Sequence, residues 1–260
     1  MVMIKHELKQ GWITLLIWTM VITFMLSLCI FIYPEMETQM ADFNSMFAEM
    51  GSFSAAFGMD KLNFGEFTGF FGVECGNILG LGGAFFAALS GIQALAKEEK
   101  DGTAEFLLTH PVSRPRILAE KLCALLLEIV LLNAVVIAVT FLSVAAIGEQ
   151  PDFKTLSLLF LAYFLLQLET AAVCFGISAF IRNGGPAVGL GMAASFYFLN
   201  LIANLTKGAR PLKYITPFGY TESADIISGG SINGRYLAVG MGFAALGIAA
   251  AFWKYRKKDI

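Results

Sequence analysis

The sequence predicts an all-α integral membrane protein with six transmembrane helices. The chain has 260 residues, of which 57% are hydrophobic and 15% are charged, and its mean hydropathy is +0.70. Soluble domains carry roughly a quarter charged residues. Several windows also exceed the roughly 18–20 apolar residues that a helix needs to cross the hydrocarbon core of a bilayer. We therefore expect a single transmembrane domain over residues 1–260.

The first part of the chain alternates between interfacial and membrane character. Residues 1–10 mix apolar and charged side chains, a pattern that favours a short helix lying along the lipid headgroups. The first span is expected at about 11–33, with Pro34 ending it. Residues 35–67 are hydrophilic but rich in Met and Phe, which is typical of an amphipathic outer loop.

Five further apolar runs follow. They predict spans at about 70–96, 122–147, 156–181, 187–205 and 236–253. The second run is rich in glycine, which suits close packing between helices in lipid. The four cysteines sit singly within or beside these runs, without paired spacing, so we interpret them as packing residues.

The distribution of Lys and Arg orients the spans, because cytoplasmic segments carry the excess. With the N-terminus in the cytoplasm, the inner segments hold twelve of these residues and the outer segments hold six. Both termini and residues 97–121 are thus expected on the cytoplasmic side. Four of the outer charges lie in 207–235, and a re-entrant segment there would account for them.

The sequence predicts no enzyme. It contains no GxxxxGK[ST] phosphate loop, and no polar segment is long enough to form a catalytic domain. The two histidines, His6 and His110, are far apart and neither belongs to an HExxH pattern. We expect no cofactor or metal in this chain, and its net charge of −2 gives no support for a nucleic-acid partner.

Polar side chains within the apolar runs need an explanation, because a charge in hydrocarbon costs at least about 2.5 kcal/mol. Glu74 is expected near the outer boundary, Glu128 near the inner one, and Glu169 deepest. Glu128 and Glu169 could line a path for a transported group or a proton, or could make protonated or hydrogen-bonded contacts between helices. Three asparagines are expected to bond between helices, namely Asn133, Asn200 and Asn204.

Residues 97–121 form a charged island between the second and third apolar runs. A charged cluster is followed by the apolar triplet 106–108, then by Pro111 and Arg114. A plain connector needs no such triplet, and so short a helix is marginal alone in water. We interpret the island as a helix that inserts into a groove on a cytoplasmic partner; the alternative is a helix lying on the bilayer surface.

The island resembles the EE-x-x-GT-x-E-x-LL-x-x-PVSR signature of type-2 ABC transporter permeases. The signature positions are occupied by Glu98, Glu99, Gly102, Thr103, Glu105, Leu107, Leu108, Pro111, Val112, Ser113 and Arg114. Residues 216–220, TPFGY, are similar to the family's SPF-x-Y, with Thr216 where serine is commoner. The ending KKDI is similar to the family's basic-Asp-Leu terminus, and Ala56-Phe57-Gly58 also fits.

This resemblance implies a membrane permease subunit that pairs with a second permease, as a homodimer or heterodimer. It further implies two copies of a separate cytoplasmic ABC ATPase, which bind ATP and Mg. Residues 1–10 would be an interfacial elbow helix and 207–235 would contain re-entrant outer helices. The implied direction is export, or extraction from the inner leaflet, in a bacterial or archaeal plasma membrane.

In this resemblance the stretch from about Thr103 to Thr109 is the coupling helix seated in the ATPase. Its candidate anchors are Phe106, Leu107 and Leu108, and its candidate rim is Glu98, Glu99, Glu105 and Arg114. Two other classes of function stay open on the residues alone. One is an ion- or proton-coupled secondary transporter that uses Glu169, and the other is an immunity factor that binds a toxic peptide without moving it.

Overall fold

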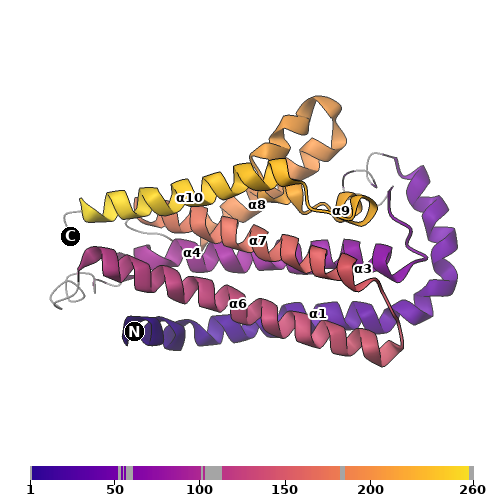
Figure 1. The fold of residues 1–260 in the computed structure, drawn as a ribbon, viewed down its shortest axis with the longest axis horizontal. Helices are drawn as coiled ribbons and strands as arrows, with labels where there is room; N and C mark the ends of the chain where they lie inside the picture. The colour runs from indigo at the N-terminus through magenta and orange to yellow at the C-terminus, as the bar shows by residue number, and fades with distance from the viewer. Residues whose placement is uncertain are drawn as a thin grey trace.

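The fold is taken from a computed structural model of the chain (Figure 1). It describes residues 2–51, 54, 56, 61–100, 102, 113–181 and 185–257, with the backbone alone at 2, 38–49, 98–100 and 207. These residues form helices and no strand, and six of the helical segments are long and apolar enough to cross a membrane. The predicted all-α fold with six spans is confirmed.

The first helix, α1 (Val2–Glu49), continues past the position where the sequence predicts its end. Pro34 lies inside the helix, so the prediction that Pro34 closes the first span is wrong. A proline is tolerated within a helix when a bend accommodates its ring and its missing N–H. The last part of α1 does turn away from the bundle axis, at the right of Figure 1. The expected outer loop thus begins as helix.

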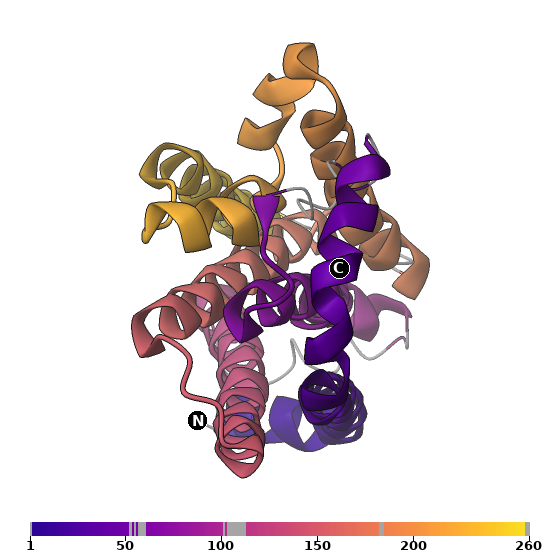
Figure 2. The ribbon, with the colours of Figure 1, turned by 90° about the vertical axis from the view of Figure 1, so that its right-hand side faces the viewer.

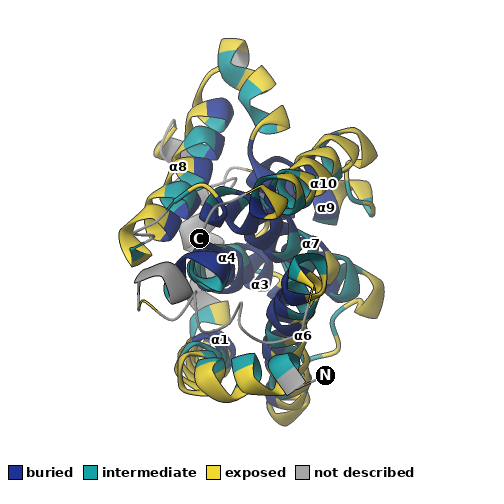
Figure 3. Cartoon of the chain, turned by 90° about the vertical axis from the view of Figure 1, so that its left-hand side faces the viewer, coloured by how far each residue is buried: buried dark blue, intermediate teal, exposed yellow. Residues whose placement is uncertain are grey.

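The N-terminal part of α1 lies across the end of the bundle before the helix turns to run along it (Figure 3). This arrangement fits the headgroup-level helix expected for residues 1–10. Beyond the turn, α1 exposes large apolar side chains, among them Trp12, Met20 and Phe24. No helix in the described part of the chain covers this apolar surface.

The second span is built from three segments that follow without a break. They are α3 (Phe67–Cys75), the π-helix η2 (Gly76–Leu81) and α4 (Gly82–Lys100). The π-helical turn lies against the ring of Tyr163, because a Cβ atom at Gly76 or Gly80 would lie 2.9 Å from the Tyr163 side chain. Glycine at these two positions therefore lets an aromatic side chain pack directly against the backbone.

The third and fourth spans are helices with well-formed starts. α6 (Arg114–Ile147) begins after Ser113 and ends at Gly148, whose φ of 79° suits glycine. α7 (Phe153–Ser178) is capped by Asp152, which accepts hydrogen bonds from the backbone N–H groups of Lys154 and Thr155. Bonds from Thr155, first its hydroxyl and then its N–H, lower the pKa of Asp152, so the cap stays charged below the usual titration range of aspartate.

The last two spans are α8 (Pro186–Leu205) and α10 (Gly234–Arg256). The α8–α10 connection, residues 206–233, contains the 3-10 helices η3 (Lys207–Tyr214) and η4 (Pro217–Tyr220) and the short helix α9 (Ser223–Gly229). Although this connection is hydrophilic overall, Phe218, Tyr220 and Ile226 are buried. Its middle part therefore packs back onto the bundle.

Both chain termini lie at one end of the bundle, which we call the terminal end (Figure 1). The end of α4 and the start of α6 lie there too, so the charged island leaves and rejoins the bundle beside the termini. Figure 2 shows the opposite end, where α9 and the last part of α1 lie across the ends of the spans.

α7 is the central helix, with α4 and α10 packed along it (Figure 3). Glycines permit both approaches. A Cβ atom at Gly91 on α4 would lie 2.6 Å from the Ala171 carbonyl oxygen, and one at Gly247 on α10 would lie 2.6 Å from that of Ala172. Without a hydrophobic driving force between helices in lipid, such close backbone contact supplies much of the packing energy.

We expect Gly247→Ala to destabilise the protein, because the added Cβ must displace the Ala172 carbonyl. Overpacking of this kind costs about 1–3 kcal/mol. Gly242→Ala is the matched control, since it lies on the same helix and its Cβ would meet nothing within 4 Å. Both substitutions replace a glycine of α10 by alanine, so the gain in helix propensity is the same for both. Thermal melting of the purified protein should place Gly247→Ala below Gly242→Ala, and equal melting temperatures would contradict the packing described.

Candidate functional site

The island predicted to contact an ATPase is only partly described. Thr103, Glu105, Phe106, Leu107, Leu108 and Pro111 lie outside the described residues. Glu98 and Glu99 lie in the last turn of α4, where the backbone alone is described. Gly102 has a φ of 67°, a left-handed conformation that glycine adopts without strain. The chain therefore leaves α4 through a turn that favours glycine.

Arg114, the first residue of α6, connects the end of the island to the last span. Its Nη1 donates hydrogen bonds to the carbonyl oxygens of Tyr255 and Arg256, each at 3.4 Å. These carbonyls belong to the last turn of α10, where a helix has unsatisfied acceptors and a partial negative charge. The guanidinium thus joins the start of α6 to the end of α10.

Lys121 connects α6 to the N-terminal part of α1. Its Nζ lies 2.8 Å from Oε1 of Glu7, and its side chain is only 2% exposed. A buried ammonium without a partner would be strongly unfavourable, so the pair constrains the two helices to move together. α6 begins at Arg114, before the span expected at about 122, and Lys121 joins this early part of the helix to α1.

Glu128 lies about two turns further along α6, beside Gly11 of α1. A Cβ atom at Gly11 would collide with the Glu128 carboxylate, so glycine is what allows the contact. Glu128, Glu7 and Lys97 line a polar cavity of about 90 Å³ between α1, α4 and α6. Glu128 therefore lies in the part of the bundle near the terminal end.

Glu169 lies in a different place, on the central helix. It is 2% exposed, and its Oε2 accepts a hydrogen bond of 2.8 Å from the Tyr220 hydroxyl of η4. It lines a groove between α7, α8 and α10, away from the cavity that holds Glu128. The structure therefore does not bring Glu128 and Glu169 together into one polar path.

Asn133 makes the contact between helices that the sequence predicts. Its Nδ2 donates a hydrogen bond of 2.7 Å to Oε1 of Gln167 on α7. Both side chains are buried, at 3% and 0% exposure. The bond joins α6 to α7 at Gln167, which lies two residues before Glu169.

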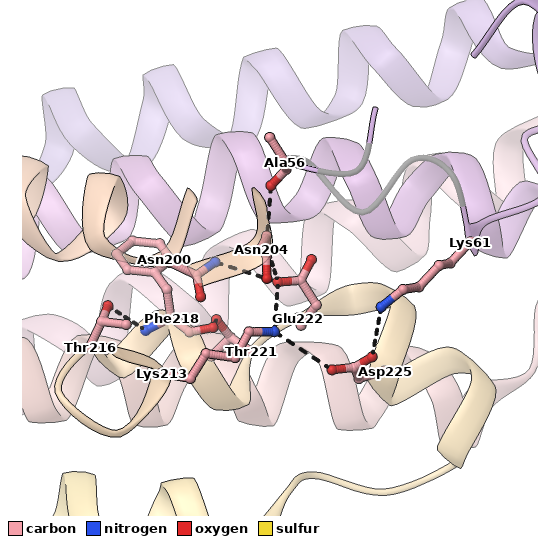
Figure 4. Close-up of polar contacts among 10 residues, drawn as sticks. All are labelled: Ala56, Lys61, Asn200, Asn204, Lys213, Thr216, Phe218, Thr221, Glu222 and Asp225. Atoms are coloured by element: carbon pink, nitrogen blue, oxygen red, sulfur yellow. Dashed lines mark hydrogen bonds and ion pairs between the residues drawn. The ribbon is translucent and has the colours of Figure 1, made fainter. Parts of the chain in front are cut away.

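A polar cluster at the opposite end was not predicted from the sequence. Figure 4 shows Glu222, which precedes α9, pointing toward the end of α8. Its Oε2 accepts hydrogen bonds from Asn204 at 2.9 Å and Asn200 at 3.4 Å, and lies 3.8 Å from Nζ of Lys213. The two asparagines predicted to link spans thus bond instead to the α8–α10 connection.

The cluster extends to the segment after α1. Nζ of Lys213 also lies 3.9 Å from Asp225, whose other oxygen lies 3.6 Å from Nζ of Lys61 (Figure 4). Asn204 donates a further bond of 3.1 Å to the carbonyl oxygen of Ala56. Three segments distant in sequence are therefore held together by one carboxylate cluster.

Thr216 anchors the same connection to the middle of α8. Its hydroxyl donates a hydrogen bond of 2.7 Å to the Phe196 carbonyl and accepts one from the backbone N–H of Phe218. A serine hydroxyl could make the same two bonds. The replacement of the commoner serine by Thr216 in the TPFGY stretch is thus compatible with its local role.

Comparison with known families decides the class of this protein. The family model described as ABC-2 family transporter protein matches residues 1–260. The chain belongs to this family. Together with the six apolar helices, the match identifies a multi-pass membrane protein that is the permease subunit of an ABC transporter. A comparison with curated proteins finds no significant match.

The described part of this ABC-2 permease contains no group of three or more His, Cys, Asp or Glu side chains arranged to hold a metal. All four cysteines are free, and Cys75 and Cys174 are buried. Burial agrees with a packing role for Cys75 and Cys174, whereas Cys29 is partly buried and Cys123 is exposed.

We expect Lys121→Met to destabilise the permease by about 3 kcal/mol, because it leaves the Glu7 carboxylate without its partner in a largely buried position. Arg116→Ala is the control, since its pair with Glu120 has an Arg116 side chain that is 66% exposed, and such pairs contribute about 1 kcal/mol or less. Titration of the purified permease with sodium dodecyl sulfate measures both. Adding Glu7→Gln to Lys121→Met should restore part of the loss, and no restoration would contradict the pairing.

Proposed function

We propose that this ABC-2 permease couples ATP hydrolysis by a separate cytoplasmic ABC ATPase to the export of a substrate. The observation that carries the proposal is where the island's signature attaches to the fold. Its two ends join α4 and α6 at the terminal end, beside the end of α10 and the N-terminal part of α1. A partner that binds the island would therefore be in reach of four elements at once.

The contacts at this end give a physical route for coupling. A displacement of residues 103–112 acts first on the start of α6. From there the Arg114 hydrogen bonds reach α10, and the buried pair of Lys121 and Glu7 reaches α1. Packed helices transmit such displacements as rigid bodies, so closure of an ATPase would move spans and not only a surface loop.

The proposed assembly has two permease chains, identical or different, and two ATPase copies that bind ATP and Mg. The excess of Lys and Arg at the terminal end supports a cytoplasmic position for both termini and the island. The same distribution supports an outer position for the remaining connections, and the resemblance to type-2 ABC permeases supports a bacterial or archaeal plasma membrane. Transport is proposed to run outward, or from the inner leaflet outward.

An ion- or proton-coupled carrier is the second candidate, and Glu169 is the observation that favours it. This carboxylate is buried in the central helix, where an ionisable group commonly marks a transport path. Uptake or extrusion by vesicles that contain this chain alone, driven by a proton gradient and lost in Glu169→Gln, would support the carrier. Dependence on the ATPase supports the ABC mechanism.

We expect Leu108→Asp to weaken binding of the ATPase by roughly 30-fold or more, because a central apolar anchor at an interface contributes about 2 kcal/mol or more. The measurement is co-purification of the ATPase with the permease, together with substrate-independent ATPase activity of the complex. The permease itself should keep its melting temperature, since residue 108 lies in the island and not in a span.

The control is Phe153→Ala. Phe153 is a large apolar side chain that is 70% exposed at the start of α7, on the other side of the bundle from the island. It should leave ATPase binding unchanged. Equal ATPase binding by wild type and Leu108→Asp would overturn the assignment of the island as the coupling element.

A further inference from the structure

A groove large enough for a small molecule lies between α7, α8 and α10. Its volume is about 410 Å³, within the range of roughly 300–1,000 Å³ that is usual for small-molecule sites. Apart from Glu169, the side chains that line it are apolar. They include the rings of Phe180, Phe196 and Phe243.

Among the described residues that line the groove, Glu169 is the one with a charged side chain, and only one of its two carboxylate oxygens has a hydrogen-bond partner among them. Oε2 accepts the hydrogen bond from Tyr220, whereas Oε1 has no hydrogen-bond or ion-pair partner among the described residues. Gly240 lies against the same carboxylate, where a Cβ atom would collide with it. The backbone of α10 thus approaches the carboxylate closely, and the Glu169 side chain lines the groove.

The depth of Glu169 restricts what can pair with it. The residue lies sixteen positions after the start of α7 and nine before its end, or roughly 24 Å and 14 Å along the helix. The ammonium group of a phospholipid stays at the headgroup level and would not reach it. A positive charge at this depth must be carried by a molecule that is itself apolar around the charge.

We propose that this groove binds lipophilic cations, with the positive charge beside Oε1 of Glu169 and apolar groups against the walls. Aromatic faces attract cations in addition to their apolar contacts. Phe180 already makes such a contact at the rim of the groove, where Nζ of Lys254 lies 5.8 Å from the ring centroid. Charge complementarity and aromatic lining thus favour a cation over a neutral or anionic molecule of the same shape.

The groove also contacts the α8–α10 connection. Ile215 of this connection lines it, and Tyr220 of the same connection holds the Glu169 carboxylate. A bound cation would therefore touch the part of the chain that covers the opposite end of the spans. That the cation is a transported substrate rests on the proposed function, whereas its binding requires neither ATP nor the ATPase.

The test is equilibrium binding of radiolabelled tetraphenylphosphonium to the purified full-length permease in detergent, with tetraphenylborate as an anion of nearly the same shape. Protein-free micelles measure the background for each ion. Wild type should bind the cation more tightly than the anion. Glu169→Gln keeps the shape of the side chain. We expect it to weaken cation binding by roughly tenfold or more and to strengthen binding of the anion, because the negative charge that attracts one ion and repels the other is removed.

Two further variants separate charge from shape and from misfolding. Ala250→Trp places a large ring in the groove and should abolish binding of either ion. Glu128→Gln removes a carboxylate that lies outside the groove and should bind like wild type. Each variant is first checked for a wild-type elution volume and melting temperature.

Equal cation binding by wild type and Glu169→Gln would overturn the proposal, since the groove would then be an apolar surface for lipid chains only. Equal binding of the two ions by wild type would overturn it as well. If the cation binds as expected but an ATPase hydrolyses ATP at the same rate with and without the permease, the binding site stands and the proposed function fails. If the complex transports other substrates with ATP but the permease does not bind the cation, the proposed function stands and the proposed binding site fails.

Discussion

The requirement that buried charges be compensated is the constraint on which this structure depends most. Charges are scarce in the spans, and most of those that are buried pair with a group from a distant segment. Lys121 and Glu7 join α6 to α1, and Glu222 joins the α8–α10 connection to α8. Because an uncompensated charge among apolar helices is costly, these few contacts determine which helices must stay together when the bundle changes shape.

The contacts fall into two groups at the two ends of the molecule. At the terminal end, Arg114 and Lys121 connect the start of α6 to α10 and α1. At the opposite end, the cluster around Glu222 connects α8, the α8–α10 connection and the segment after α1. Between them α7 packs through glycines against both α4 and α10. Such a molecule can carry a displacement from one end to the other along rigid spans.

The sequence predicts the six spans well because the cost of placing polar groups in hydrocarbon is a local property, read from each run of residues. The prediction that Pro34 ends the first span is wrong because a helix can bend at a proline and continue beyond it. The partners of Glu222 and Arg114 could not be predicted, since they come from residues up to 142 positions away and no spacing pattern indicates them.

The measurement that tests the account most directly is the ATPase activity of the purified permease, alone and after assembly with the proposed ATPase partner in proteoliposomes. We predict no hydrolysis by the permease alone, and hydrolysis by the complex at a rate that differs from that of the isolated ATPase. Nucleotide hydrolysis by the lone chain would contradict the account. So would an ATPase whose rate is the same with and without the permease, because the two would then be uncoupled.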